Sequence, residues 1–238
     1  MNANEEIIPE LQTAIQVSAN DLFIERADQI ISRLRNKKLD AELRDWVKTK
    51  NSNLLFGSYL IAKYEYPDLN FDDLEAKLGK IINDLRLEIN LYLTGLQQVR
   101  KINHILYSIH KFSGDFSNIV DPENSYVNKV LERKKSNDIS IAILYLHIAQ
   151  KLGLPVYGID FPRNFLLVFF DNKTNEALFY INPFNKGAII TRRDIETFLK
   201  NHKIKTKKNY FEKCSNNIII QRLLKLLMHS YGRKNNKE

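Results

Sequence analysis

Apolar residues in about the first 110 positions recur at helical spacing. Between residues 21 and 36 they return every three or four positions behind Asp21, a residue type that caps helices, so an amphipathic helix is predicted there. A second helix is predicted over residues 41–50 and a third over residues 54–66. The third is stopped by Pro67, which cannot continue a helix.

The next apolar stripe is the longest of this region. It opens at Asp72 or Asp73, and its apolar positions fall on a single face of a helix. Gly95 is expected to break or bend this helix before a further helix that reaches about Phe112. The N-terminal part of the chain is therefore predicted to be a helical bundle.

The pattern changes after residue 112. Residues 113–124 are rich in Gly, Asp, Ser and Asn and are predicted to form a loop, and short helical signals follow over residues 125–134. Asn137 or Asp138 is then expected to cap a helix over residues 139–152. Because that helix is apolar on nearly every side, it is predicted to be buried.

Three short runs of β-branched and aromatic residues come next. They cover residues 156–161, 165–170 and 177–181, and the polar segment 171–175 is predicted to be a hairpin turn. Residues 182–188 are predicted to form a loop. We therefore expect three antiparallel strands that pack against the buried helix.

Two helices are predicted after the strands, one capped by Thr191 and one over about residues 210–230. Helices and strands that are segregated along a chain indicate an α+β fold. We expect an N-terminal helical region at residues 1–112, followed by a core at residues 113–200. That core would hold the buried helix against a small three-stranded antiparallel sheet. A basic helical segment at residues 201–238 completes what is expected to be one compact unit.

Composition narrows the class of protein. The chain has 238 residues, of which 44% are hydrophobic, and this is enough to form a core. Residues 1–9 are acidic and lack an apolar segment, so no signal peptide is predicted, and no apolar stretch is long enough to span a membrane. Cys214 is the single cysteine, which excludes an internal disulfide and a cysteine-based zinc site. We expect a cytoplasmic protein.

The net charge of +8 is concentrated near the C-terminus. Residues 200–238 contain eleven Lys and Arg against two acidic residues, so the rest of the chain is close to neutral. A solvated, Lys-rich segment is the favoured interpretation. Nucleic-acid binding through this segment is retained as an alternative.

Several short sequence strings occur in an order and spacing that are specific when taken together. They lie within roughly residues 50–230 and are Tyr66–Leu69, Asp121–Tyr126, Asn137–Ile141, Leu152–Pro155, Gly158–Pro162, Asn164–Leu167 and Asn182–Asn185. This series resembles the SirB-type transglutaminase-like proteins of bacteria. The resemblance implies a fold like that of cysteine proteases and transglutaminases. In active members a nucleophile opens the central helix, a His lies on one strand and an Asp lies at a neighbouring strand.

The three triad positions carry other residues in this chain. Ser140 is the nucleophile-type residue nearest the start of the buried helix, Asn164 stands at the His position, and Asn182 stands at the Asp position. An amide has no protonation step near neutral pH, and a serine without a base stays protonated. The resemblance therefore implies a pseudoenzyme that binds an unidentified protein partner, and we expect no cofactor and no metal.

Structural roles are also open to these residues. Ser140 is expected to cap the helix or hydrogen-bond within it, and Asn164 and Asn182 to bond each other or nearby backbone. His147 lies on the same helix, roughly 10 Å along the axis from Ser140, so it cannot replace the missing base. Cys214 follows a lysine, which is an environment able to lower a thiol pKa. An amide-bond hydrolase or acyl transferase that uses Ser140 or another nucleophile remains the enzymatic alternative.

Overall fold

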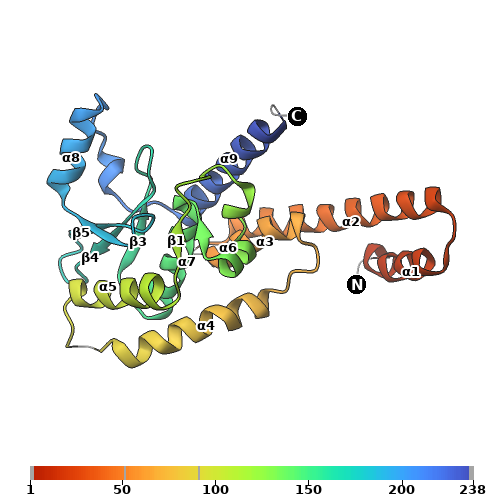
Figure 1. Ribbon diagram of the computed structural model, residues 1–238, viewed down its shortest axis with the longest axis horizontal. Helices are drawn as coiled ribbons and strands as arrows, with labels where there is room; N and C mark the ends of the chain where they lie inside the picture. Colours follow the sequence, from red (N-terminus) through yellow and green to blue (C-terminus); the bar gives the residue numbers. More distant parts are fainter. Residues whose placement is uncertain (1–2, 51, 91, 236–238) are drawn as a thin grey trace.

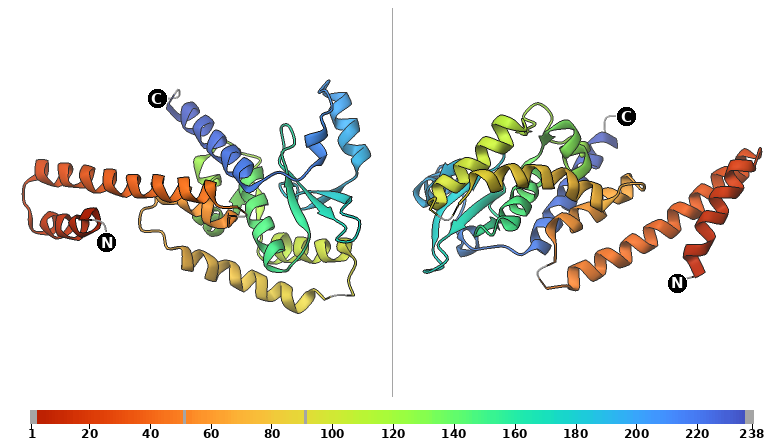
Figure 2. Two further views of the ribbon diagram at one scale, coloured as in Figure 1. Left: turned by 180° about the vertical axis from the view of Figure 1, so that it is seen from behind. Right: turned by 90° about the horizontal axis from the view of Figure 1, so that it is seen from below.

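The computed structural model describes residues 3–50, 52–90 and 92–235. A body of helices around a small sheet carries a helical arm that projects from one side (Figure 1). Two further views show that the arm stands clear of the body (Figure 2). The molecule is therefore elongated, and its two parts differ in how they bury their apolar side chains.

The arm consists of two helices, α1 (Ala3–Val17) and α2 (Asp21–Lys48), which fold back on each other. The side chain of Asn20, rather than the predicted Asp21, caps α2. We predicted two separate helices in place of α2, and this prediction was wrong. The polar residues Asn36, Lys37 and Lys38 interrupt the apolar pattern, but none of them is glycine or proline, so the backbone continues as a helix.

The first part of the body is helical, as predicted. It contains α3 (Leu54–Glu65), α4 (Phe71–Glu88), α5 (Gly95–Asn103) and η1, a π-helix at His104–Ile109. The glycine expected to break or bend the long helix instead begins α5. Thr94 caps that helix through a reciprocal capping box, so the chain starts a new helix at this point.

A short parallel ladder leads to the buried helix. Its strands are β1 (Ser113–Gly114) and β2 (Lys135–Ser136), with η2 (Pro122–Asn124) and α6 (Val127–Arg133) between them. The ladder fixes the backbone directly before α7 (Asp138–Lys151). Every α7 residue from position 139 to position 149 is buried, which confirms the predicted central helix.

The main sheet is antiparallel and follows the chain order β3-β4-β5-β6. The three predicted strands are β3 (Val156–Ile159), β4 (Leu166–Phe170) and β5 (Ala177–Asn182). The predicted loop at 182–188 contains a turn that leads into a fourth strand, β6 (Ala188–Ile190). The α+β fold class is therefore confirmed, with one more strand in the main sheet than the sequence predicted and with the unpredicted ladder of β1 and β2.

Side chains on the two faces of the sheet belong to different hydrophobic clusters. The main cluster joins one face to α3, α4, α7 and α9 (Asn216–Asn235), and α9 contributes Ile219, Ile220, Leu223 and Leu227. The second cluster lies on the opposite face beneath α8 (Arg192–Asn201) and η3 (Lys208–Phe211). The sheet and α7 are thus covered on both sides, which is what a stable core of this class requires.

Two sequence-based expectations concern the whole chain. No helix within the described ranges is long and apolar enough to cross a lipid bilayer. The division at residues 112 and 200 stays a prediction, and the main cluster takes side chains from all three of the proposed parts.

Candidate functional site

The head of α7 is held by a buried asparagine. Asn137 is fully buried, and its side-chain Oδ1 accepts a hydrogen bond from the Ser140 N–H at 2.9 Å. Its Nδ2 donates to the Ser125 Oγ at 2.8 Å, and its backbone N–H donates to the Asn124 carbonyl at 3.2 Å. One side chain thus caps the helix and joins it to the preceding segment.

The Ser140 hydroxyl is part of the same buried arrangement. Ser140 is 4% exposed, and its Oγ donates to the Ser125 carbonyl at 3.3 Å. This is a long hydrogen bond, but it directs the hydroxyl toward protein backbone. The structure therefore places Ser140 at the head of the helix, as expected, in a capping environment.

Asp138 connects the head of α7 to the start of β4. Its Oδ2 accepts a hydrogen bond from the Phe165 N–H at 2.7 Å and lies 3.7 Å from the Arg222 guanidinium. Burial raises the pKa of Asp138, while the Phe165 N–H and the Arg222 charge act in the opposite direction. Arg222 also donates to the Asp160 carboxylate at 2.7 Å and to the Phe161 carbonyl at 2.6 Å. A single arginine of α9 therefore ties three segments together beside the triad positions.

Asn164 and Asn182 lie at the same end of adjacent strands. Asn164 is half-buried in the bend before β4, and Asn182 ends β5. The pairing of Leu167 with Ile181 sets the register of these two strands. The Asn182 Oδ1 accepts the Asn185 N–H at 3.1 Å, so this side chain shapes the following turn. Among the described residues, no hydrogen bond joins the side chains of Ser140, Asn164 and Asn182 to one another.

The turn after β5 is anchored by residues that the sequence did not single out. The Tyr107 hydroxyl donates to the Pro183 carbonyl at 2.8 Å, and the Asn103 Nδ2 donates to the Gly187 carbonyl at 2.8 Å. The Tyr145 hydroxyl donates to the Asn103 Oδ1 at 3.1 Å. These three residues come from α5, η1 and α7, so no local sequence pattern would have brought them together.

A second unpredicted group lies before η2. The Asp115 Oδ1 accepts hydrogen bonds from the Ser117 hydroxyl at 2.6 Å and from the backbone N–H groups of Ser117 and Asn118. Its Oδ2 accepts the Asn124 Nδ2 at 3.1 Å. The hydrogen bond from Ser117 is the main cause that lowers the pKa of Asp115 to about 2, with Asn124 and the backbone acting in the same direction. The carboxylate therefore fixes the loop that follows β1.

Cys214 is partly buried and His147 is buried, and neither lies in a catalytic arrangement. Burial raises the pKa of the Cys214 thiol to about 12, and the nearby Asp160 charge acts in the same direction. The predicted lowering of the Cys214 pKa by its lysine neighbour was wrong, because Lys213 is directed to the Tyr157 and Phe170 rings. Burial lowers the pKa of His147 to about 4, so its imidazole is neutral at pH 7. The described residues include no group of three His, Cys, Asp or Glu side chains placed to hold a metal ion.

Three cavities in the described part of the chain are lined by other residues. One of about 720 Å³ lies between α1, α2 and α3, one of about 850 Å³ lies beside η3, and one of about 430 Å³ lies between the start of α5, the segment after α7 and the β4–β5 turn. Ser140, Asn164 and Asn182 line none of these three. The three residues assigned to triad positions therefore lie outside these cavities.

This arrangement of a buried helix, whose head meets the start of an antiparallel sheet, matches a known class. The chain belongs to the transglutaminase-like superfamily, whose family profile matches residues 72–225. That range includes α4, α7, the whole main sheet and the first half of α9. The coarse part of the predicted family is therefore confirmed.

Several curated proteins are similar to the chain. A UPF0162 protein of Xylella fastidiosa (strain 9a5c) is 29% identical over 149 residues, which are 63% of this chain and 52% of that protein. A UPF0162 protein of Vibrio cholerae is 29% identical over 177 residues, covering 73% of this chain and 64% of that protein. F-box only protein 21 of Mus musculus is 26% identical over 208 residues, covering 74% of this chain and 33% of that protein. The chain thus spans between a third and two thirds of the length of these relatives. No solved structure gives a significant match.

Proposed function

We propose that this transglutaminase-like chain is a non-catalytic binding or regulatory protein of the SirB type, built on a degenerate triad. The observation that carries the proposal is the use of the Ser140 hydroxyl. It is buried and donates to the Ser125 carbonyl, while the base position holds the amide of Asn164. A serine that lacks a base and is hydrogen-bonded to backbone is a poor nucleophile.

The remaining nucleophiles and bases support the same conclusion. His147 is two turns further along α7, and its lowered pKa leaves it a weak base. The Cys214 thiol stays protonated at neutral pH. Removal of triad members from a serine hydrolase lowers the rate by on the order of a millionfold. Acyl transfer at this site is therefore not the function that the geometry favours.

An exposed aromatic patch near Asn182 supports a binding role. Phe116 is 67% exposed and Ile119 is 45% exposed. The Phe116 ring lies 4.5 Å from that of Phe184, which is two residues after Asn182. Because Asp115 fixes the backbone of this loop, the patch is held in place before a partner arrives. Phe116, Ile119 and Phe184 are therefore the surface we assign to a protein partner.

Labelling of intact protein tests the absence of catalysis. The chain would be incubated with a fluorophosphonate and, separately, with iodoacetamide, and the adducts located by mass spectrometry. We expect no fluorophosphonate adduct at Ser140, and alkylation of Cys214 only after unfolding. A Ser140 adduct in the wild type that is absent from Ser140→Ala would instead favour the acyl-transferase or hydrolase alternative.

Capture of a partner tests the binding role. Proteins retained from a native cell extract by the wild type would be compared with those retained by Phe116→Ser and by Leu87→Ser. Leu87 is 90% exposed on α4 and serves as the matched control. We expect a partner held by the wild type and Leu87→Ser to be lost with Phe116→Ser. Equal capture by all three chains would contradict the assigned surface.

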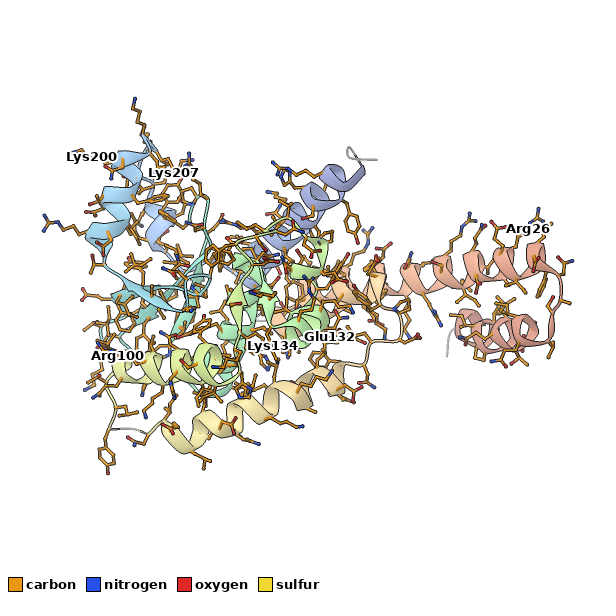
Figure 3. The ribbon with its side chains drawn as sticks, in the orientation of Figure 1. Arg26, Arg100, Glu132, Lys134, Lys200 and Lys207 are labelled. Atoms are coloured by element: carbon orange, nitrogen blue, oxygen red, sulfur yellow. The ribbon has the colours of Figure 1, made fainter. Side chains whose placement is uncertain are left out.

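The nucleic-acid alternative concerns a different part of the molecule. Lys200 and Lys207 are exposed at the end formed by α8 and the loop after it (Figure 3). Lys203 and Lys205, in the same loop, are also exposed. Filter binding to single- and double-stranded nucleic acid across a range of salt concentrations tests this alternative, because phosphate contacts weaken as salt rises. Absence of binding at low salt would exclude it.

A further inference from the structure

The projecting arm buries few of its apolar side chains. α2 is about 40 Å long, and within its outer half only Ala27 and Ile31 are buried. The other two buried residues of α2, Leu39 and Trp46, belong to the main cluster of the body. Two helices enclose little apolar surface on their own, and helices of this kind are normally stabilised by packing an amphipathic face.

Three exposed apolar residues of the arm fall on one side of it, while Val17 and Leu22 are exposed near its tip. Ile7 is 41% exposed on α1, and Phe23 and Ile30 are 40% and 46% exposed on α2. Each of them directly precedes a more buried isoleucine that faces the seam between the two helices, at positions 8, 24 and 31. Positions that precede seam residues fall on the same side of an antiparallel helix pair. Ala14, which is partly buried, precedes Ile15 in the same way. Ile7, Ala14, Phe23 and Ile30 therefore form a single surface, which we name the apolar strip.

The strip lies on the side of the arm away from the body. The opposite side is one wall of the cavity of about 720 Å³, which is lined by Ile8, Asp28 and Arg35 of the arm and by Phe56 and Tyr59 of α3. No strip residue lines that cavity. The arm that carries the strip projects clear of the body (Figure 2).

We propose that the arm is a dimerisation element and that two copies of the chain pack their apolar strips together as a four-helix bundle. The strip repeats at a spacing of seven residues on each helix, from Ile7 to Ala14 and from Phe23 to Ile30. A seven-residue spacing is the repeat with which helices interlock in bundles and coiled coils. A second arm therefore supplies the layer that this one lacks.

Charge beside the strip determines how the two arms align. Glu10 is three residues after Ile7, and Arg26 occupies the equivalent place three residues after Phe23. Arg26 projects into solvent from α2 near the tip of the arm (Figure 3). Opposite charges at matching positions favour packing of α1 from one copy on α2 of the other. A two-fold axis parallel to the arms gives this pairing. Both bodies then lie at the same end of the bundle, on opposite sides of the axis.

Sedimentation equilibrium of the full chain tests the proposal. We expect a dimer for the wild type and a monomer for the double variant Phe23→Glu and Ile30→Glu, with a dissociation constant raised about 30-fold or more. Circular dichroism would verify that the variant keeps its helices, since both positions are exposed in the single chain. Leu87→Glu, at an exposed site on α4, is the matched control and is expected to remain dimeric. A wild type that is monomeric at its highest soluble concentration overturns the proposal.

A charge exchange tests the alignment without touching the apolar strip. Glu10→Arg and Arg26→Glu are each expected to weaken the dimer, and the two together are expected to restore it. Restoration supports packing of α1 on the partner's α2. Failure of the combined variant to recover affinity overturns that alignment, and equal loss of the dimer in Leu87→Glu overturns the assignment of the surface.

Discussion

At the scale of single residues, the head of α7 is held by amide and hydroxyl groups whose hydrogen bonds are made within the protein. Asn137 alone caps the helix and binds two residues of the preceding segment. Buried polar groups that are paired in this way specify one arrangement, and removing one partner leaves the others unpaired. The polar groups at the head of α7, Ser140 among them, thus contribute to the fold of this chain.

Gly187 gives the sharpest prediction at this scale. Its φ is +71°, and a Cβ at this position would lie 2.0 Å from the Asn103 Oδ1. Gly187→Ala is expected to lower the free energy of unfolding by about 3 kcal/mol or more, because backbone strain and a clash with Asn103 add together. Urea unfolding, monitored by circular dichroism, measures this change in the free energy of unfolding.

Gly153 offers the matched control for this substitution. Its φ is +70°, but no atom lies within 4 Å of its Cβ position. Gly153→Ala is expected to lose only about 1 kcal/mol, from backbone strain alone. Equal losses at the two glycines would show that Asn103 does not constrain the turn.

His147 gives stability a dependence on pH. Burial lowers its pKa to about 4, whereas an unfolded histidine titrates near 6.5. The unfolded chain therefore binds this proton more tightly than the folded chain. The stability that the neutral His147 side chain supports is complete above about pH 6.5 and is lost as pH falls toward 4. The loss is on the order of 3 kcal/mol. Unfolding free energies of the wild type and His147→Leu, measured between pH 7 and 4, are expected to diverge, and parallel curves would contradict the assignment.

Sequence reasoning reaches some residues of the candidate site and misses others. Ser140, Asn164 and Asn182 were assigned to triad positions from the order of short strings, and this assignment stays a prediction. Asn103 and Tyr107 were not found, since their partners are 84 and 76 residues away along the chain. Contacts of that separation depend on the packing of whole elements, and no local pattern contains them.

At the scale of elements, α9 is joined to the head of α7 by charge as well as by apolar packing. Arg222 contacts Asp138 and Asp160, and its guanidinium lies 5.5 Å from the centre of the Phe165 ring. Substitution by methionine removes the charge and keeps most of the apolar stem. Arg222→Met is expected to lower the free energy of unfolding by about 2–4 kcal/mol at neutral pH, because Asp138 remains buried without its cation.

The same variant has a predictable pH dependence. Without the guanidinium the pKa of Asp138 rises further, and a carboxyl group with a raised pKa destabilises the fold only where it is ionised. The loss of unfolding free energy caused by Arg222→Met is therefore expected to become smaller as pH is lowered. Asp138→Asn, added to Arg222→Met, is expected to reduce the same loss at neutral pH. Arg192→Met, which breaks an exposed pair with Glu196, is the control and should change stability by less than about 1 kcal/mol.

Element boundaries were predicted well where the chain carries its own start and stop residues. Pro67 ends the region of α3, and the apolar run of α7 identified the central helix. Two elements were misjudged for opposite reasons. α2 was divided because polar residues interrupt its stripe, although helices of an exposed arm need no continuous stripe. β6 was missed because three residues are too few to show an alternating pattern, and its pairing with β5 depends on the intervening turn.

At the scale of the whole molecule, the body is stabilised by a hydrophobic core to which the outer part of the arm does not contribute. The main cluster begins at Leu39, so none of its residues comes from the outer part of the arm. Removal of residues 1–36 is therefore expected to leave the free energy of unfolding of the body within about 1 kcal/mol of the full chain. The shortened chain is expected to be a monomer. A body that fails to fold without these residues would show that the arm is an integral part of the core.

The junction between arm and body holds the only tryptophan of the chain. Trp46 is 5% exposed, its indole N–H donates to the Asn53 carbonyl at 2.7 Å, and its ring lies where a Cβ on Gly57 would be only 2.6 Å away. Intrinsic fluorescence excited at the indole band therefore comes from this one junction. A ligand, partner or second copy that changes the packing of Trp46 will alter the emission without an added dye, whereas events confined to the sheet will leave the emission unchanged.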